Sequence, residues 1–416
     1  MINKFNFTNA AILFKQKKPL LIRKIEIPEK LHEGQVLVKN FYSGVCGSQL
    51  GEIEGIKGKD NYLPHLLGHE AVGEVLKVGK KVLRVKKGDH VLLHWMPTKG
   101  ISSPGPKYIL KNKIINAGPI ATFSNLSIIS ENRLTPVKRN LVNQKELLLL
   151  GCTVSTAVGS IKKLTNYDKT ETVAVAGCGA IGLSLIKVLK YLGTKKIIAI
   201  DLDEKKLKIA KKFGATFCIN SRKKKILDTI VSKFPSKIDK FFECTGSVDV
   251  ISDAFECLNQ MGSEILIGVP QFKKKAKFYT LDINLGKKLV GCKGGNFQPS
   301  EDLFKYLRLM EDKKFHIKEL ITREVKFVSL DGSKICKTCE LQNKTNGKKG
   351  ETKVPRFQQY CLFCEESNFY MPSDSRWGIS AKAHKDYCNK TYKLNEYILF
   401  LSEFNETSNC INLKCY

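Results

Sequence analysis

The 416-residue chain has no long apolar run that is free of charges. Its longest such stretch, Leu147 to Ile161, is too short and too rich in Gly, Ser and Thr to span a bilayer. The first residues also lack the basic, apolar and small-residue segments of a secretory signal peptide. We therefore expect a cytoplasmic protein whose 14 cysteines are mostly thiols or metal ligands rather than disulfides.

Arginine is scarce in a chain that is otherwise strongly basic. The formal net charge is +30, but only nine of the 70 basic residues are arginine, which leaves 61 lysines. Arginine is the usual reader of bases and phosphates. The lysines occur in short runs along the whole chain, which is typical of solvated faces, so a nucleic-acid partner is not expected.

The most informative stretch of the sequence runs from Glu171 to Lys206. The apolar run 172–176 leads into a glycine-rich turn at 177–182, and apolar residues at helical spacing follow. A second apolar run, 197–200, then ends in an acidic residue. A strand, a glycine turn, a helix, a strand and an acid in this order indicate a dinucleotide-binding unit.

Each glycine of the turn has a physical role. Gly177 permits the tight turn, Gly179 lets the backbone approach a pyrophosphate, and Gly182 lets the helix pack closely on the strand. Asp201 is placed to accept both ribose hydroxyls and would repel a 2′-phosphate, which favours NAD over NADP. The predicted cofactor-binding residues are Gly177, Gly179, Ala180, Ile181, Gly182, Asp201 and Lys206.

The rest of the chain divides by pattern. Residues 1 to about 150 show alternating short strands and frequent turns, which indicates antiparallel sheet. From 171 to about 295, strands and helices alternate, which indicates an α/β fold with a doubly wound parallel sheet. The strands expected there are 173–176, 197–200, 216–219, 240–243 and 265–268.

Three short motifs contain residues that bind metals in other proteins. Cys46 lies in GVCGS, His69 in GHEAVG and Cys152 in LGCT. Two thiolates and an imidazole form the open, three-ligand type of zinc site that is catalytic rather than structural. Taken singly, each cysteine could be a small core residue and the histidine a satisfied interior one. Spacing alone does not group them, because more than a hundred residues separate the first from the last.

The order of the motifs resembles the medium-chain dehydrogenase/reductase family, in particular its zinc-dependent alcohol and polyol dehydrogenases. The matching pieces are GVCGS, LPHLLGHEAVGEVLKVG, VKKGDHV, LLGCTVSTAVG, AVAGCGAIG, FECTGS, ILIGVP and KELIT. The resemblance implies a GroES-like β-barrel catalytic domain followed by a Rossmann nucleotide domain. The predicted segments are 1–150 for the first, 151–298 for the second and 299–330 for a return towards the catalytic domain.

The resemblance also implies the roles of individual residues. Cys46, His69 and Cys152 would bind the catalytic zinc, Glu70 would be a nearby carboxylate, and Ser48 would take the proton of the substrate. Glu70 as a structural ion-pair partner and Ser48 as a turn hydroxyl remain open alternatives. The implied reaction moves a hydride between NAD and an alcohol or a polyol or sugar-like substrate. The resemblance further implies a homo-oligomer.

Two departures from the family pattern fall near the expected site. Where many members have Asp-x-His after the serine, this chain has Gln49-Leu50-Gly51, so no charge and no proton-passing group follow. His65 is either a substitute for the missing histidine or an ordinary loop or pocket histidine.

The chain also has no cysteine between Gly88 and Pro136, which excludes the four-cysteine structural zinc lobe of many members. In its place, His94, Trp95 and Met96 either line the substrate cleft or leave His94 solvated while the other two pack in the barrel.

The resemblance fails after about residue 330. The segment 331–416 is cysteine-rich, and its two CxxC pairs, separated by 21 residues, have zinc-ribbon spacing. The predicted ligands of this structural zinc are Cys336, Cys339, Cys361 and Cys364. The alternative is a poorly folded appendage with accidental pairs. Because family members complete the barrel here, a degenerate NAD-binding or interaction protein with a zinc-binding tail is the alternative function.

Overall fold

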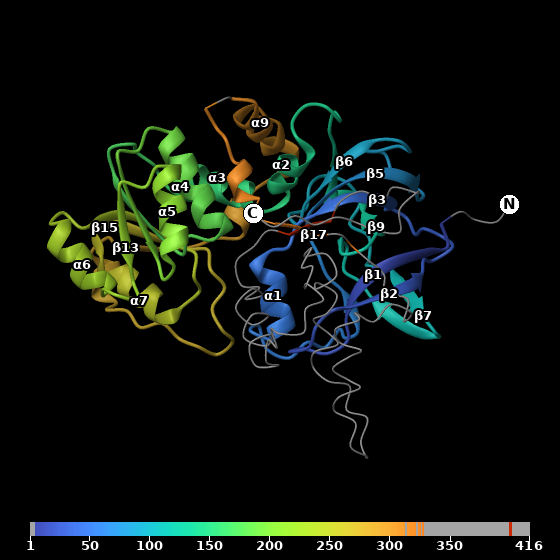
Figure 1. Ribbon diagram of the computed structural model, residues 1–416, viewed down its shortest axis with the longest axis horizontal. Coiled ribbons are helices and arrows are strands. Elements are labelled where there is room, and N and C mark those ends of the chain that lie inside the picture. The colour runs from blue at the N-terminus through green and yellow to red at the C-terminus, as the bar shows by residue number, and fades with distance from the viewer. Residues whose placement is uncertain (1–4, 313, 322, 326, 328–398, 402–416) are drawn as a thin grey trace, which may run out of the picture. The chain divides into compact units, whose positions relative to one another are not determined.

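The computed structural model describes residues 5–312, 314–321, 323–325, 327 and 399–401 (Figure 1). These residues belong to one compact unit, and a second unit, Ser329–Asn395, lies outside the described residues. The proposed tail ligands Cys336, Cys339, Cys361 and Cys364 therefore also lie outside them.

The N-terminal part is built from short, mainly antiparallel strands, as predicted. A closed barrel has the order β1 (Phe7–Leu13), β2 (Leu21–Glu26), β7 (Lys107–Leu110), β8 (Lys113–Asn116) and β4 (His65–Leu66). A five-stranded sheet beside it has the order β10 (Leu134–Pro136), β6 (His90–Leu93), β5 (Ala71–Val78), β3 (Gln35–Ser43) and β9 (Leu126–Ser130).

Strand β3 is buried on both faces. Leu37 packs into one apolar cluster, whereas its neighbours Val36 and Val38 pack into another, because successive side chains of a strand point to opposite sides. The strand therefore packs into two cores, and this packing fixes the position of the segment that leads to Cys46.

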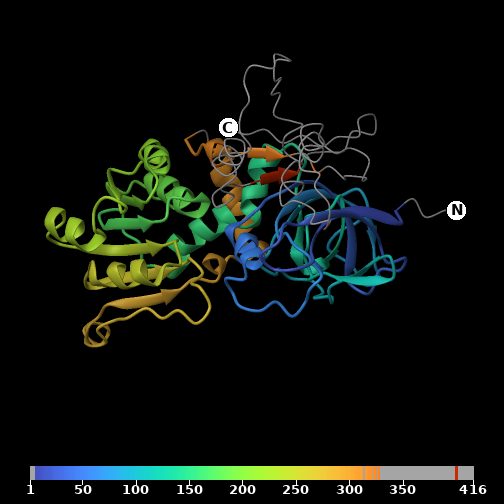
Figure 2. The same ribbon diagram turned by 60° about the horizontal axis from the view of Figure 1, so that its bottom comes forward.

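The second part is a six-stranded, wholly parallel sheet (Figure 2). Its order is β13 (Phe217–Asn220), β12 (Lys196–Asp201), β11 (Thr172–Ala176), β14 (Ile238–Glu243), β15 (Leu258–Leu266) and β16 (Lys288–Gly291). The helices between these strands are α4 (Ala180–Tyr191), α5 (Glu204–Phe213), α6 (Ile226–Lys233), α7 (Val248–Glu256) and α8 (Leu281–Asn284). This confirms the doubly wound parallel sheet.

Alternate residues of β11 face two different cores. Val173 and Val175 belong to one apolar cluster, and Ala174 and Ala176 belong to the other. A strand with helices on both sides has no polar face, which explains the unbroken apolar run in the sequence.

The remaining elements connect the two parts. They are α1 (Gly47–Glu54), η1 (Glu131–Arg133), α2 (Gln144–Leu148), η2 (Leu149–Gly151), α3 (Thr153–Leu164), η3 (Gly294–Asn296), α9 (Pro299–Glu311), η4 (Lys318–Leu320), β17 (Arg323–Val325) and β18 (Leu399–Leu401). β17 and β18 pair in parallel, so a short strand from the tail region joins the described part of the chain.

Helix α3 is deeply buried although its sequence is rich in small polar residues. A Cβ atom on Gly159 would lie only 2.1 Å from the carbonyl oxygen of Gly295, so the helix and that loop are in direct backbone contact. The hydroxyls of Thr156 and Ser160 donate to carbonyl oxygens one turn earlier, at Cys152 and Thr156 respectively, which satisfies them inside the core.

No single helix among the described residues is long and apolar enough to cross a membrane. Only the bent pair Gln144–Gly151 and Thr153–Leu164 meets that length and composition when its two members are counted together.

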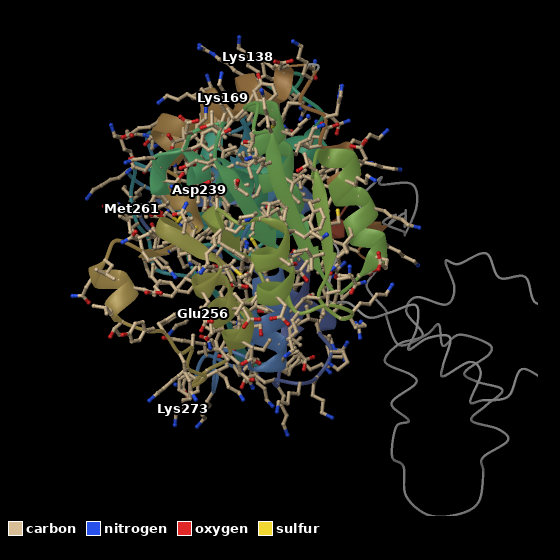
Figure 3. The ribbon with its side chains drawn as sticks, turned by 90° about the vertical axis from the view of Figure 1, so that its left-hand side faces the viewer. Lys138, Lys169, Asp239, Glu256, Met261 and Lys273 are labelled. Atoms are coloured by element: carbon tan, nitrogen blue, oxygen red, sulfur yellow. The ribbon has the colours of Figure 1, made fainter. Side chains whose placement is uncertain are left out.

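Basic side chains are spread over the surface of the described chain. Figure 3 shows nitrogen-tipped side chains around the whole view, with Lys138 and Lys169 near its top and Lys273 near its bottom. This agrees with lysines scattered over solvated faces.

Candidate active site

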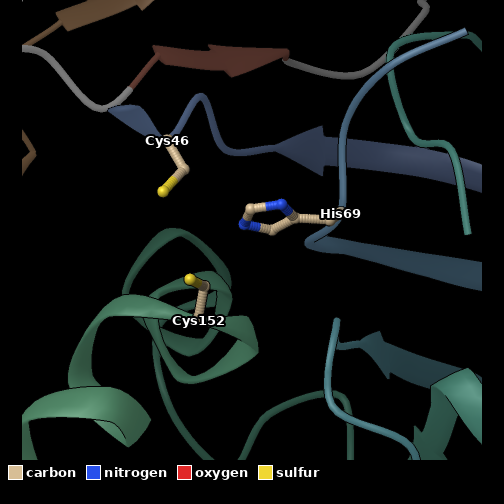
Figure 4. Close-up of side chains that lie close together, drawn as sticks. All are labelled: Cys46, His69 and Cys152. Carbon is tan, nitrogen blue, oxygen red and sulfur yellow. The ribbon is translucent and has the colours of Figure 1, made fainter. Parts of the chain in front are cut away.

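The three predicted metal ligands come from three chain reversals and meet at one place. Cys46 is the N-cap of α1, Cys152 is the N-cap of α3, and His69 lies in the turn between β4 and β5. Their ligand atoms all lie within 4.8 Å of one another. In Figure 4 the two sulfur atoms and a nitrogen of the His69 ring face a common space.

The chemistry of this cluster suits a zinc ion. Two sulfurs and one imidazole nitrogen are its preferred soft and borderline ligands, and three protein ligands leave a position open. The Nε2 atom of His69 is buried and has no hydrogen-bond partner among the described residues, as expected for an atom reserved for a metal.

The electrostatics of the cluster favour a thiolate at Cys46. Its pKa lies well below the ordinary value because Cys152 and His69 lie next to its sulfur, although burial opposes the shift. The pKa of Cys152 is raised well above its ordinary value by the neighbouring Cys46 sulfur and by burial. Burial alone would lower the pKa of His69, but the Cys46 sulfur raises it. Both cysteines also lie at positive helix N-termini, which favour anionic sulfur.

Gln49 lies directly behind His69. Its Oε1 atom accepts a hydrogen bond from the Cys46 backbone N–H at 2.8 Å, and its Nε2 atom lies 2.5 Å from Nδ1 of His69. The side chain is almost fully buried, with 2% of its surface exposed. Where many family members have an aspartate next to this ligand, the chain therefore has a neutral amide that contacts both Cys46 and His69.

Ser48 and Glu70 both have buried oxygens without hydrogen-bond partners among the described residues. A Cβ atom on Gly44 or Gly151 would lie 2.6 Å from the Glu70 side chain, so two glycines make the space that it fills. Burial raises the pKa of Glu70 to about 8, with an opposing effect from His69. Among the described residues no ion pair of Glu70 is found, so the alternative of a structural salt bridge has no support there.

The other two histidines singled out from the sequence, His65 and His94, have partners for both ring nitrogens. His65 lies in strand β4, where it contacts Asp60 through Nε2 at 2.6 Å and the carbonyl oxygen of Leu66 through Nδ1 at 3.0 Å. His94 is fully buried, and its ring nitrogens contact the Met96 carbonyl oxygen and the Thr135 hydroxyl. The expectation of a solvated His94 is wrong, because β6 and β10 enclose this ring.

Trp95 borders the metal-ligand cluster. The centroid of its ring lies 6.3 Å from that of His69. On its other side, a Cβ atom on Gly294 would lie 2.4 Å from the indole. Sequence reasoning missed this loop, although two adjacent glycines, both with positive φ, signal a close backbone approach at 294 and 295.

The glycine turn has the predicted geometry. Gly177 adopts a φ of 87°, and a Cβ atom on Gly182 would lie 1.9 Å from the Gly177 carbonyl oxygen. Around Gly179, in contrast, a Cβ atom would meet nothing within 4 Å. Gly179 is also the N-cap of α4 and has no side chain to cap its first N–H groups, which leaves them for an anion. Ala180 and Ile181 form the first turn of the same helix.

Asp201 ends β12 beside this turn. Its carboxylate accepts hydrogen bonds from the Cys178 N–H at 2.6 Å and from the Asp203 N–H at 2.9 Å. Lys206 places its Nζ atom 4.0 Å from the same carboxylate. The acid and the glycine turn therefore lie side by side at the carboxyl edge of the parallel sheet.

Comparisons with known proteins agree with this arrangement. Residues 32–139 match the alcohol dehydrogenase GroES-like domain, and residues 180–312 match the zinc-binding dehydrogenase domain. An S-(hydroxymethyl)glutathione dehydrogenase of Haemophilus influenzae is 31% identical over 64% of this chain and 78% of the relative. Alcohol dehydrogenase 2 of Zea mays is 28% identical over 77% of this chain and 92% of the relative.

A solved structure shares the fold. Benzyl alcohol dehydrogenase of Acinetobacter calcoaceticus superposes with a TM-score of 0.67 at 24% identity, covering 82% of this chain and 97% of that one. The likeness extends over the GroES-like barrel and the Rossmann sheet together.

Proposed function

The chain belongs to the zinc-dependent alcohol dehydrogenases of the medium-chain dehydrogenase/reductase family, and from this we propose that it moves hydride between NAD and an alcohol. Family membership establishes an oxidoreductase of the zinc type. The identity of the cofactor and the polyol or sugar-like class of substrate are the proposed parts.

The observation that supports the proposal most strongly is the convergence of Cys46, His69 and Cys152 within 4.8 Å. We assign these three residues as the zinc ligands. Zinc bound there would act as a Lewis acid that polarises the oxygen of the substrate and makes its hydroxyl more acidic.

Ser48 is proposed as the group that receives the proton of the substrate. Its Oγ atom is buried and unpartnered among the described residues, and it is two positions from Cys46 in the same helix turn. A hydroxyl can accept and donate at once, so Ser48 can hold this proton by hydrogen bond. Gly51 has no side chain with which to continue the path. The proton therefore passes from Ser48 to a ribose hydroxyl or to water.

Glu70 is proposed as the carboxyl group that lies behind the ligands. The glycines at 44 and 151 leave the space in which it is buried, and neither of its carboxyl oxygens has a hydrogen-bond partner among the described residues. Its role is to position the ligand cluster and to adjust the local charge.

Gly177, Gly179 and Gly182 are proposed to seat the pyrophosphate of NAD at the N-terminus of α4. Bound NAD would accept the hydride from the substrate carbon. Asp201, held by two backbone N–H groups, would accept ribose hydroxyls and repel a 2′-phosphate. Ala180, Ile181 and Lys206 complete the proposed cofactor site.

Metal analysis together with activity tests this proposal. The purified full chain should contain zinc and reduce NAD with at least one member of a panel of small alcohols, polyols and sugars. Cys46→Ser and His69→Ala should each lose one zinc equivalent and nearly all activity. The Ser48→Ala variant should keep its zinc but lose about 10²- to 10⁴-fold in kcat. Full activity in the ligand variants would refute catalysis by zinc at these residues. No zinc and no turnover in the wild type would leave the degenerate NAD-binding alternative.

We further propose that the chain forms a homodimer through β16. This strand is the edge of the parallel sheet and has no partner on its outer side among the described residues. Figure 2 shows it, in gold, at the outer edge of the sheet. Large apolar side chains are exposed in the segments next to it, namely Met261, Tyr279, Leu281, Ile283 and Leu285. An open edge with an apolar border favours pairing with a second copy.

A further inference from the structure

Gln49 uses both ends of its side-chain amide: the oxygen accepts one hydrogen bond and the NH₂ group donates another. Its carbonyl oxygen accepts the Cys46 backbone N–H at 2.8 Å, which closes the first turn of α1. Its NH₂ group lies 2.5 Å from Nδ1 of His69, so in this arrangement the ring nitrogen is the acceptor.

A metal bound to His69 would change Nδ1 from a hydrogen-bond acceptor into a donor. The proposed zinc site uses Nε2, the buried and unpartnered ring nitrogen that faces the two sulfurs. A neutral imidazole that gives one nitrogen to a metal has its hydrogen on the other. Nδ1 is then a donor, and it faces the amide NH₂ group, which is also a donor.

If the amide of Gln49 turns over, two donors no longer face each other at His69 but do so at the Cys46 N–H. The carbonyl oxygen would then accept from Nδ1 of His69, but the NH₂ group would face the Cys46 N–H. Because the side chain is 2% exposed, water has little access to the group left unpaired. A carboxylate has acceptors on both oxygens and could satisfy both donors at once.

We propose that Gln49 is the positioning residue that sets the metal affinity of this site, and that it sets it low. Loading the metal turns the amide over and gives up the bond that closes α1. Changing Gln49 to an acidic residue removes the mismatch without changing the ligands. The inference rests on the proposed zinc site at Cys46, His69 and Cys152.

The test is a metal titration. Apo full-length protein is titrated with Co²⁺ at slightly alkaline pH, and the cobalt–thiolate absorption is followed. Competition with a chelator then gives the zinc affinity. The signal that a Cys46→Ser variant lacks is assigned to this site, which separates it from cysteines elsewhere in the chain.

Gln49→Glu should bind Zn²⁺ and Co²⁺ about 10- to 100-fold more tightly than the wild type, the range expected when a partner of a ligand changes. Gly47→Asp adds the same charge one residue from Cys46, at an exposed position where a new side chain meets nothing within 4 Å. This control should change the affinity by less than about threefold. Gln49→Asp provides a second carboxylate variant if Gln49→Glu folds poorly.

Equal affinities for Gln49→Glu and the wild type, or equal gains in Gln49→Glu and Gly47→Asp, would overturn the inference and leave the proposed function intact. The proposed function fails separately if the wild type and Cys46→Ser give the same cobalt signal.

Discussion

At the residue scale, Trp95 borders the ligand cluster, and we expect it to limit the size of the substrate. Its indole lies between His69 and the Gly294 loop, where both neighbours limit its movement. We expect a side chain of this size next to the ligands to leave room for a small substrate group and to exclude a large one.

Trp95→Ala should therefore shift specificity towards bulky alcohols. We expect kcat/KM for benzyl alcohol to rise relative to that for ethanol by about 10-fold or more, in line with the 1–3 kcal/mol that one pocket group contributes to discrimination. Steady-state rates of NAD reduction with both alcohols measure the ratio. Trp377 lies outside the described residues, so Met96→Ala is the nearest matched truncation. An unchanged ratio in Trp95→Ala would place the indole away from the substrate.

Single residues were predicted with uneven success. The sequence motifs grouped Cys46, His69 and Cys152 correctly in space, because a family pattern encodes their meeting point. Of the two alternatives for His94, the solvated ring was wrong, since its burial against β10 depends on strands that are far apart in sequence. The two contacts of Gln49 could not be predicted either. The sequence shows that a charged residue is missing, but it does not show how the amide side chain is oriented.

At the element scale, Gly179 and Gly182 of the glycine turn differ in their surroundings. A methyl group on Gly182 would collide with the Gly177 carbonyl oxygen, whereas one on Gly179 would enter open space. Gly182 serves the packing of α4 on β11, and Gly179 is the glycine that we propose for the approach of the cofactor.

Gly179→Ala and Gly182→Ala should therefore separate stability from NAD affinity. Gly182→Ala should lower the free energy of unfolding by about 1–3 kcal/mol through overpacking. Gly179→Ala should change it by less than about 1 kcal/mol but weaken NAD binding at least about 10-fold. Denaturant unfolding and calorimetric NAD titration measure the two effects. Equal NAD affinity in Gly179→Ala and the wild type would contradict the proposed pyrophosphate position.

Strand β15 contains a buried acid, Glu264, whose two carboxyl oxygens have no partner among the described residues. Burial, and then the charge of Glu243, raise its pKa to about 9. In the unfolded chain a glutamate ionises near pH ~4.3. The folded state thus retains a proton that the unfolded state has lost, and stability should fall as the pH rises towards 9.

Glu264→Gln should remove this pH dependence. Between about pH 6 and about pH 8, the wild type should lose on the order of 1 kcal/mol per pH unit more than the variant. Urea unfolding at three pH values measures the difference. Glu256→Gln, at an exposed position of α7, is the matched control and should follow the wild type. Parallel pH curves for the wild type and Glu264→Gln would show that Glu264 ionises normally.

The elements themselves followed the sequence closely where their burial is simple. The apolar runs of β11 and β12 and the helix face of Leu183, Ile186 and Leu189 are buried as expected. Strand β16 was missed because it is a four-residue edge strand next to lysines, with little apolar pattern. β15 begins earlier than expected, since Leu258 at its start pairs with Ile238 of β14.

At the scale of the whole molecule, we expect the open edge of the parallel sheet to mediate self-association. The exposed apolar residues around β16 form a border that would be costly to leave in water. The wild type should therefore be dimeric at micromolar concentration.

Leu281→Glu combined with Leu285→Glu should weaken this dimer at least about 10-fold, because two charges would be buried against their own copies. Leu83→Glu, at a site in the N-terminal part that is 91% exposed, should have no effect. Sedimentation velocity over a concentration series distinguishes the cases. A dimer that tolerates the double change but is disrupted by Leu83→Glu would move the interface to the other part.

The division into a β-rich part and a parallel sheet was predictable, because each has its own hydrophobic period. The predicted domain boundaries remain predictions, and the proposed zinc ribbon at Cys336, Cys339, Cys361 and Cys364 lies outside the described residues. Neither could be settled by local pattern, since both depend on long-range contacts.

The ligand set has a consequence for how the protein is made. Cys152 follows the whole N-terminal β-rich part, so a nascent chain that has exposed only Cys46 and His69 can offer a metal two of its three ligands. Ribosomes add roughly 5–20 residues per second. Tight metal capture must therefore wait until α3 has left the exit tunnel, and the ion joins a barrel whose strands are already made.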